Sequence, residues 1–508
     1  MFWAFTVLFC VIVASIVYLL MQTFSASKAA KSNAMELIEE TENNRMLTAQ
    51  GDVVFCYRLR LPECFSLSEA DYDRLYEIWR IALKDFPQDT IVLRSDRYDR
   101  RPFDVSAMPE NSYIRREEKR YAAKRLQTVD ASYLFVVFTG FRSVRDVRNS
   151  NPFVGLSHRK IKAEDAAYRL FLAAVDSMYQ QLAGSGAVGI EPMTEEEIRD
   201  YAQYYFNGFQ SDFLTDAEAS DAFIRIGDRF IGAVSIEHER QFPETLRSPQ
   251  PSCRMKIPTG IFEDLGVVLP LPHLYNQVIV LSGHAKEVEQ VKRTLDSFRK
   301  NRGFSEEIED QVHRLDKTRE ELSDDLDALL VRGHTNILFW AENEALLKTY
   351  RSTITNLMKQ VRDFEPVVPT GGELRNVFYC SHPATVACME RDSFYLTDIR
   401  HAIALFQQTG GYMPDDTGVY YSDPIDHLPL RYDLYDARKK YVDSRNIAVI
   451  GRTGGGKTVN LEAVVEGFHN SPDADYVNII IDCGGSYDKA ARLYDPNEVF
   501  LFRYSPEA

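Results

Sequence analysis

In the first third of the chain, segments whose apolar residues have the spacing of a strand alternate with segments whose apolar residues have the spacing of a helix. Residues 53–61 alternate between apolar and mixed positions, which predicts a half-buried strand. Residues 90–93 and 133–138 are short apolar runs, and the second predicts a buried strand. The stretches between them, residues 68–87 and 112–126, have the spacing of helices. This order of strand, helix and strand predicts a small α+β domain.

Two helices carry a start signal in the sequence. Ser68 precedes Asp71 by three residues, and Thr194 precedes Glu197 by the same distance. At this spacing the hydroxyl and the carboxylate each accept a bond from a backbone N–H group that the helix leaves open. We therefore predict helix starts at both places, and the second helix should reach Phe206.

The same rhythm continues along the chain and predicts a second α+β subdomain, with the division between the two near residues 190–220. Two apolar runs on either side of Gly227-Asp228 predict a β-hairpin. The expected strands cover residues 223–226, 230–236, 277–281 and 336–340, and the expected helices cover residues 164–182, 286–300, 306–331 and 342–361.

A glycine-rich segment near the carboxyl end matches the pattern of a phosphate-binding loop, G-x-x-x-x-G-K-[ST]. Residues 446–450 before it are apolar and β-branched, which predicts a buried parallel strand, and residues 459–468 after it have helical spacing. Glycine lets the backbone turn its N–H groups toward phosphate oxygens, and the start of the following helix favours an anion. The predicted nucleotide-binding residues are Gly451, Arg452, Thr453, Gly454, Gly455, Gly456, Lys457 and Thr458.

Two side chains of this loop would act on the nucleotide directly. Lys457 would reach the β- and γ-phosphates of ATP, and the Thr458 hydroxyl would bind Mg²⁺. ATP and Mg²⁺ are therefore the expected cofactors, and these two residues are the expected catalytic residues. The alternative is a glycine-rich turn in which the Lys-Thr pair is incidental.

Beyond the loop, residues 476–481 predict a buried strand that ends at Asp482, and residues 499–504 predict another. An apolar strand ending in Asp suggests a direct contact with Mg²⁺, but no Glu follows to orient a water, so a structural position for Asp482 is the other interpretation. Residues 428–508 would form the beginning of an α/β phosphate-loop (RecA-like) ATPase domain. This length is short for a whole domain of that kind, and we expect the sequence to be the amino-terminal portion of a longer protein.

The first residues predict a transmembrane helix. Residues 1–24 contain no charged side chain and are long enough to cross a bilayer. Lys28 and Lys31 follow directly, and because basic residues stay on the cytoplasmic side, we expect a single-pass protein of the inner (cytoplasmic) membrane with its bulk in the cytoplasm. A cleaved signal peptide is the alternative. Residues 25–50 would form a linker, and residues 51–427 the α+β region.

The chain of 508 residues carries a net charge of −16, which argues against a protein that coats nucleic acid over its whole surface. Local basic patches are still compatible with this balance. One group of cations lies between the predicted strands, interleaved with carboxylates: Arg97, Arg100, Arg101, Arg115, Arg116, Lys119, Arg120, Lys124 and Arg125. The group is either a solvated helix face or a contact with acidic lipid headgroups or a partner.

The seven cysteines are scattered and include no C-x-x-C pair, which is typical of reduced thiols in a cytosolic compartment. Cys380, His382, Cys388 and His401 are residue types that bind zinc, but their spacing fits no common structural zinc signature. Buried or incidental positions are the simpler interpretation.

Several of these segments occur together in one known family. They are residues 61–67 (LPECFSL), 72–79, 194–197 with 204–206, 446–458 and 481–487 (IDCGGSY). Over residues 45–508 the chain thereby resembles the TraG-type conjugation-system ATPases of Bacteroidetes mobile elements, a branch of the TraC/TrbE class of type IV secretion ATPases.

The resemblance implies a hexameric, membrane-associated ATPase that powers assembly and substrate passage in a conjugation channel. Its partners would be inner-membrane components of a type IV secretion system and further copies of itself, with DNA contacted indirectly or transiently. The Walker B motif and an arginine finger would lie beyond Ala508. Two alternatives are a DNA-pumping coupling protein, in which the phosphate loop is typically much nearer the membrane segment, and a non-hydrolysing truncated scaffold.

Overall fold

A computed structural model describes the greater part of the chain between residues 37 and 502. Contacts divide the chain into two compact units, Met1–Asp99 with Thr128–Gly411 and Arg100–Gln127 with Tyr412–Ala508. The described residues are 37–63, 67–106, 108, 113–140, 166–210, 217–243, 261–262, 269–282, 329–361, 363–411, 414–415, 418–422, 428–434, 446–469 and 477–502.

Three predicted helices fall largely or wholly outside these residues. They are the transmembrane helix at 1–24 and the helices at 286–300 and 306–331. Among the helices that the structure does describe, none combines the length and the apolar character needed to cross a bilayer. Residues 330 and 331 are described, and they begin a strand instead of ending a helix.

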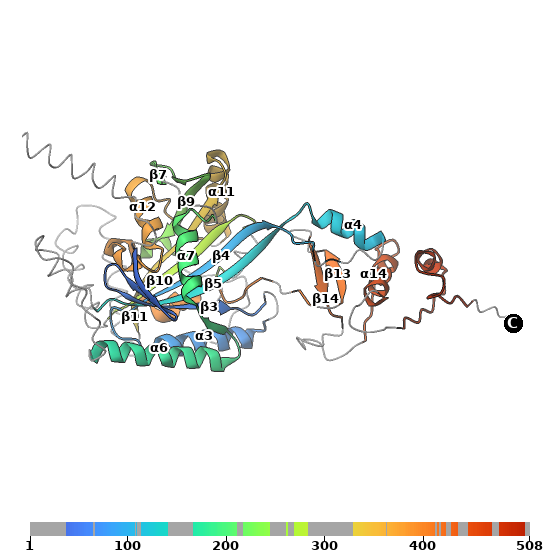
Figure 1. The fold of residues 1–508 in the computed structure, drawn as a ribbon, viewed down its shortest axis with the longest axis horizontal. Coiled ribbons are helices and arrows are strands. Elements are labelled where there is room, and N and C mark those ends of the chain that lie inside the picture. The colour runs from blue at the N-terminus through green and yellow to red at the C-terminus, as the bar shows by residue number, and fades with distance from the viewer. Residues whose placement is uncertain are drawn as a thin grey trace, which may run out of the picture. The chain divides into compact units, whose positions relative to one another are not determined.

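The first unit is built on one large, largely antiparallel sheet, which makes the fold a mixed α/β one (Figure 1). Its strands follow the order β1-β2-β3-β5-β4-β10-β11-β9-β8-β7, with β6 beside β3 and β12 beside β11. The strands are β1 Ile38–Glu42, β2 Arg45–Thr48, β3 Val53–Arg60, β4 Ile91–Pro102, β5 Leu126–Phe138, β6 Gly189–Pro192, β7 Ala217–Ala219, β8 Ile224–Ile226, β9 Arg229–Ile236, β10 His273–Leu281, β11 Leu330–Ala341 and β12 Tyr395–Asp398.

Strand β3 is buried on both of its faces. Phe55 and Tyr57 belong to the core on one side of the sheet, and Val54 and Cys56 belong to the core on the other side. The predicted strand is confirmed, but the prediction that it is only half-buried is wrong. Helices cover both sides of the sheet here, so neither face of the strand meets solvent.

Helices α3 (Glu69–Leu83) and α6 (Ala166–Ser185) cover one face of the sheet (Figure 1). Trp79 of α3 and Phe171 of α6 are fully buried in this core. The predicted start of α3 is confirmed, since the N–H of Ser68 donates to Asp71 Oδ2 at 2.9 Å and the N–H of Asp71 donates to Ser68 Oγ at 3.4 Å. The short helix α13 (Ile399–Ala404) adds Ile403 to the same core.

A buried cation lies within this packing. Arg94 of β4 is 0% exposed, and its guanidinium carbon lies 5.1 Å from the ring centres of Trp79 and Phe406. The guanidinium pairs with Asp96 at 3.3 Å and donates a hydrogen bond to the carbonyl oxygen of Gln407. The two rings, the carboxylate and the carbonyl stabilise this buried charge, while Arg94 Nε and Nη1 have no hydrogen-bond partner among the described residues.

The segment that ends the first unit is bound to the sheet at several points. The N–H of Gly410 donates to the Pro62 carbonyl at 2.8 Å, and the N–H of Gly411 donates to Asp130 Oδ2 at 2.8 Å. With the bond from Arg94 to Gln407, these contacts fix residues 407–411 as part of the first unit.

Helices α7 (Glu195–Phe206) and α12 (Gly371–Cys380) lie on the other face of the sheet. The start of α7 is confirmed, because the N–H of Thr194 donates to Glu197 Oε2 at 2.8 Å and the N–H of Glu197 donates to Thr194 Oγ1 at 3.3 Å. The helix ends at Phe206, as the sequence predicts.

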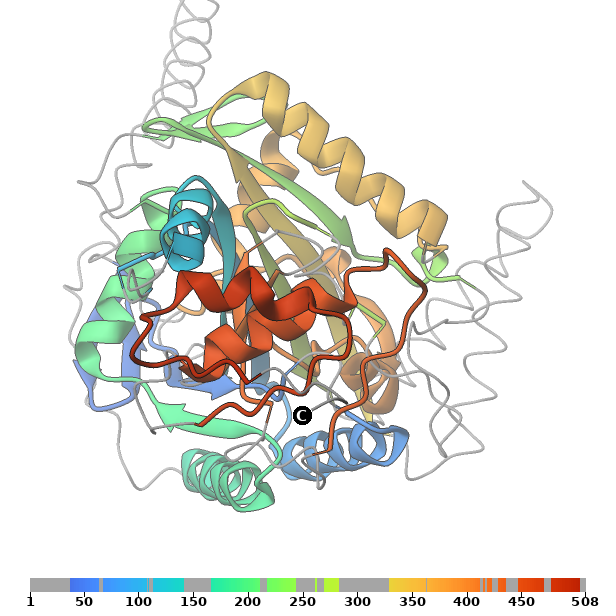
Figure 2. The ribbon, with the colours of Figure 1, turned by 90° about the vertical axis from the view of Figure 1, so that its right-hand side faces the viewer.

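Strands β8 and β9 form the predicted hairpin, with Gly227 at the turn in a left-handed conformation (φ 56°). Helix α11 (Glu344–Asn356) runs along β9 and β11 (Figure 2) and continues into a π-helical turn at Leu357–Val361. A Cβ atom on Gly232 of β9 would lie 2.7 Å from the ring of Phe339, so this close contact between neighbouring strands requires glycine.

The second unit contains α4 (Tyr113–Ala122), the antiparallel strands β13 (Val419–Ser422) and β14 (Pro429–Tyr432), and helix α14 (Lys457–His469). Helix α14 packs against β13. Short 3₁₀ turns occur in the two units at Glu239–Gln241, Val386–Cys388, Arg391–Ser393, Ser486–Asp488 and Ala490–Leu493.

The prediction of three strands in the second unit is wrong for the residues that the structure describes. Residues 446–450, 477–481 and 499–502 form no strand, and most of their apolar side chains are exposed. Ile450 is 94% exposed and Ile481 is 89% exposed. An apolar run forms a strand only when a neighbouring strand supplies ladder partners, and none pairs with these segments within the described residues.

Candidate nucleotide-binding site

The glycine-rich loop leads directly into helix α14. The helix predicted over residues 459–468 is confirmed and begins two residues earlier, at Lys457. Residues 451–456 are all exposed to solvent. The loop is therefore accessible from outside the second unit.

Two glycines of the loop adopt the left-handed conformation that the motif requires. Gly454 has φ 77° and Gly456 has φ 82°. A Cβ atom placed on either glycine would have no described atom within 4 Å. The space over the loop is open at these positions, so the reason for glycine is the backbone conformation and not crowding.

Lys457 folds back over the loop from the first position of α14. Its Nζ donates hydrogen bonds to the carbonyl oxygens of Gly451 at 2.8 Å and Arg452 at 3.0 Å. Both are backbone acceptors at the start of the loop, so the ammonium group is held across the loop. An ammonium group has three donors, and a phosphate oxygen could take the third.

The first turn of α14 adds backbone donors at the same place. The N–H of Asn460 donates to the Gly456 carbonyl at 2.9 Å, which begins the helical hydrogen bonds. Earlier N–H groups of a helix have no intrahelical acceptor, and together with the helix dipole they favour an anion. Thr458 lies in this turn and is half-buried. Its place in the first turn is the one at which the motif would use a hydroxyl to bind Mg²⁺.

The remaining loop residues contribute through the backbone. Arg452 and Thr453 are exposed, and the carbonyl of Arg452 also accepts the N–H of Gly455 at 3.1 Å. A Cβ atom on Gly455 would lie 3.0 Å from that carbonyl oxygen, so the turn is tight there. All eight predicted residues thus lie on one exposed turn and the first turn of α14.

The buried face of α14 differs from the predicted one. Leu461 is 38% exposed, and the other predicted apolar positions, Val464, Val465 and Phe468, are half-buried. The buried residues are Glu466 and Gly467. Glu466 accepts a hydrogen bond from the Tyr494 hydroxyl at 2.8 Å, and a Cβ atom on Gly467 would lie 2.7 Å from Val419 of β13. The spacing of apolar residues could not predict this packing, because the two buried residues are a glutamate and a glycine.

Asp482 has a structural position. Its Oδ1 accepts the N–H of Gly484 at 2.9 Å, and its Oδ2 accepts the N–H of Tyr487 at 2.9 Å. The backbone bond from Tyr487, followed by that from Gly484, lowers the pKa of the Asp482 carboxyl. The carboxylate therefore holds the turn in which Gly485 has φ 67°.

The Cys and His residues considered as zinc ligands have other contacts. The thiol of Cys380 lies 3.3 Å from Asn376 Oδ1, and that of Cys388 lies 3.0 Å from Gln50 Oε1. His382 Nδ1 accepts the backbone N–H of Ala384 at 3.1 Å. Within the part of the chain that the structure describes, no three His, Cys, Asp or Glu residues are grouped so that they could hold a metal ion.

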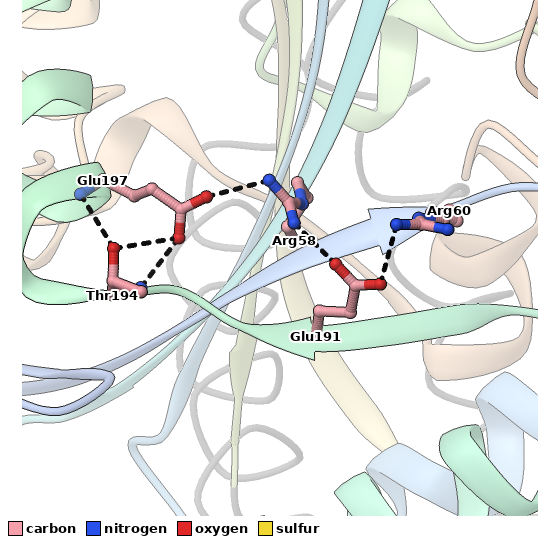
Figure 3. A network of polar contacts seen from close by, with 5 residues as sticks. All are labelled: Arg58, Arg60, Glu191, Thr194 and Glu197. Atoms are coloured by element: carbon pink, nitrogen blue, oxygen red, sulfur yellow. Dashed lines mark hydrogen bonds and ion pairs between the residues drawn. The ribbon is translucent and has the colours of Figure 1, made fainter.

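One polar network stands out in the first unit, around Arg58 of β3 (Figure 3). Arg58 binds Glu197 Oε1 at 2.8 Å and Glu191 Oε2 at 2.6 Å, and Arg60 binds Glu191 Oε1 at 3.0 Å. The hydrogen bond from Arg58 lowers the pKa of Glu191. Because Glu197 also caps α7, the network ties β3 to β6 and to the start of that helix, which is a structural role.

Comparison of the chain with models of known protein families and with curated proteins finds no match.

Proposed function

We propose that residues 451–458 bind the triphosphate of ATP with Mg²⁺, and that the chain contributes a motor ATPase to a conjugative type IV secretion system. The nucleotide-binding part of this proposal rests on the loop. The α/β (RecA-like) ATPase domain and the membrane anchor at residues 1–24 rest on the sequence patterns described above. The motor, its hexamer and its partners rest on the resemblance.

The observation that carries the nucleotide site is the combination of exposed left-handed glycines with a lysine held over the loop. Gly454 and Gly456 leave open space where the phosphates would lie, and the Lys457 ammonium is bonded to the Gly451 and Arg452 carbonyls of the same loop. Backbone N–H groups and one cation are what a triphosphate needs in order to be bound without its water shell.

The first experiment measures binding of a fluorescent ATP analogue to the full chain in the presence and absence of Mg²⁺. Lys457→Ala removes the ammonium group that is bonded to the Gly451 and Arg452 carbonyls. We expect this change to abolish detectable binding. Lys489→Ala is the matched control, because Lys489 is an exposed lysine of the same unit with no place in the loop.

Equal binding by the wild type and Lys457→Ala would refute the proposed site. Binding that needs Lys457 but is unchanged when Mg²⁺ is removed would refute the role given to Thr458. The motor is tested separately, by measuring conjugative transfer in cells in which the gene carries the Lys457→Ala change. Undiminished transfer would refute the motor and leave the nucleotide site standing.

A further inference from the structure

The segment that connects β4 to β5 has a positive net charge, whereas the chain as a whole has a negative one. Residues 100–127 contain eight Lys and Arg side chains and four Asp and Glu side chains, a net charge of +4 in a chain of net charge −16. Arg97, which the sequence groups with these cations, lies in the first unit, where it pairs with Asp99 at 3.0 Å and lies 4.7 Å from the ring centre of Tyr204. The remaining cations belong to the second unit.

Helix α4 presents one face to solvent. Ala122 is fully buried and marks the inward side of the helix. At 100° per residue, the opposite side holds four residues that are all exposed, namely Arg116, Glu117, Arg120 and Tyr121.

Two cations of this face, Arg116 and Arg120, are exposed and four residues apart, so with a rise of about 1.5 Å per residue they lie about 6 Å apart along the helix. Lys124 is exposed in the turn that directly follows the helix, where its N–H donates to the Tyr121 carbonyl at 3.3 Å. Within the described part of the chain, Arg120 pairs with the carboxylate of Glu117 at 3.8 Å, and both side chains of this pair are largely exposed. A pair of this kind is weak, so the row keeps most of its positive charge.

An aromatic ring stands beside the cation row. Tyr121 is 49% exposed, and the Arg125 guanidinium lies 4.4 Å from its ring centre. An exposed ring backed by a guanidinium gives a flat surface on which a base can stack, while phosphates follow the cations alongside.

We propose that this face, made of Arg116, Arg120, Tyr121, Lys124 and Arg125, binds single-stranded nucleic acid without sequence preference. The cation row would neutralise backbone phosphates, and Tyr121 would stack on a base. An anionic bilayer fits the face less well, because a helix that lies in a membrane surface carries several Trp, Phe or Leu side chains. On the described outward side of α4 the only large apolar side chain is that of Tyr121.

The test measures binding of a fluorescein-labelled thymidine 20-mer to the full chain in non-ionic detergent, by fluorescence anisotropy over a series of salt concentrations. The variant Arg116→Gln/Arg120→Gln/Lys124→Gln should weaken binding about tenfold or more at low salt. Losing three phosphate contacts should also reduce the steepness of the log–log salt dependence by about 2. The control Lys84→Gln/Lys359→Gln/Arg391→Gln removes the same charge from exposed positions of the first unit and should bind like the wild type.

A second variant tests the stacking. Tyr121→Ala should weaken binding between about fivefold and a hundredfold without changing the salt dependence, and Tyr121→Phe should retain wild-type binding. Lys457→Ala should also retain it, which separates this surface from the phosphate loop.

Three results would overturn the proposal. One is no binding of the oligonucleotide by the wild type. Another is an equal loss of binding in the α4 variant and its control, which would indicate a response to net charge alone. The third is binding to vesicles containing phosphatidylglycerol, lost in the α4 variant, without binding to the oligonucleotide.

Discussion

Lowering the pH should destabilise the first unit, because its interior holds neutral imidazole rings. His382 is 1% exposed and lies against the rings of Tyr205 and Phe206, with centres 5.0 and 4.6 Å away. Its Nδ1 accepts the N–H of Ala384, so a proton added there would face another donor. Burial lowers the pKa of His382 to about 3.

His273 is in a similar state. It is fully buried and stacks on Tyr98 with ring centres 4.6 Å apart. Its Nδ1 lies 2.8 Å from the carbonyl oxygen of Leu271, so this nitrogen carries the proton and donates it. Nε2 has no hydrogen-bond partner among the described residues. Burial lowers the pKa of His273 to about 4, although the hydrogen bond to Leu271 and the charge of Asp99 act in the other direction.

The sign and size of the effect follow from these pKa values. Each imidazole has a pKa near 6.5 in the unfolded chain and a lower one in the folded unit, so the unfolded chain binds more protons below pH 6.5. The stability that the two neutral rings contribute is fully present above pH 6.5. It is lost as the pH falls toward the folded-state pKa values of about 4 for His273 and about 3 for His382. At pH 5 the loss is about 2 kcal/mol for each ring, since one pKa unit is worth about 1.4 kcal/mol. Two rings give about 4 kcal/mol, a large share of the 5–15 kcal/mol typical of a domain.

Urea unfolding at pH 7.5 and pH 5, followed by tryptophan fluorescence, measures this loss. Trp79 and Trp340 are both buried in the first unit and report on its unfolding. Trp3 lies outside the described residues and is replaced by Phe in every variant. The quantity compared is the difference between the free energies of unfolding at the two pH values.

His382→Asn tests the assignment. The Asn side chain can accept the N–H of Ala384 but cannot take up a proton, so the difference between pH 7.5 and pH 5 should shrink by about 2 kcal/mol. Any cavity that the smaller side chain leaves lowers the stability at both pH values and cancels in the difference. His401→Asn is the control, because it makes the same substitution at an exposed position, and it should change the difference by less than His382→Asn does. An unaltered difference in His382→Asn would show that this ring is not held neutral by the fold.

Three further substitutions test the loop, the core and a helix cap. Gly456→Ala, at φ 82°, should weaken binding of the ATP analogue about fivefold or more, whereas Gly484→Ala, outside the left-handed region, should not. Trp79→Ala should lower the free energy of unfolding by about 3–5 kcal/mol in urea titrations, and Ile81→Ala, at a position 37% exposed, by less than about 1 kcal/mol. Thr194→Ala should cost about 1 kcal/mol in the same titration, and Thr194→Ser should restore most of it; equal stability of all three proteins would refute the capping role.

Local patterns in the sequence predict much of the first unit. The capping boxes at Ser68 and Thr194, the hairpin turn at Gly227 and most of the strands and helices lie where periodicity and turn chemistry place them. Local patterns do not predict which strands pair. Strand β10 lies between β4 and β11, and such pairing depends on contacts between distant parts of the chain. For the same reason, no local pattern predicts that residues 100–127 group with the carboxyl-terminal residues.

The candidate site is predicted in part. The motif predicts the loop and the start of α14, because glycine, lysine and a hydroxyl at fixed spacing reflect backbone conformation and charge, which are local properties. It does not predict the surroundings. Gly467 is buried against Val419, and Glu466 is bonded to Tyr494. Neither contact follows from the periodicity of apolar residues. The runs at 446–450 and 477–481 are apolar enough for strands, yet a strand also needs a neighbour.

The contacts of Arg94 bear on where the chain can be shortened. A version ending at Ala404 would delete both Phe406 and the Gln407 carbonyl and leave a guanidinium in the interior facing one carboxylate and one ring. A version ending at Gly411 would keep every acceptor and the backbone bonds to Pro62 and Asp130. An expression boundary placed at the end of α13 would therefore remove residues that Arg94 needs. We expect such a shortened protein to aggregate.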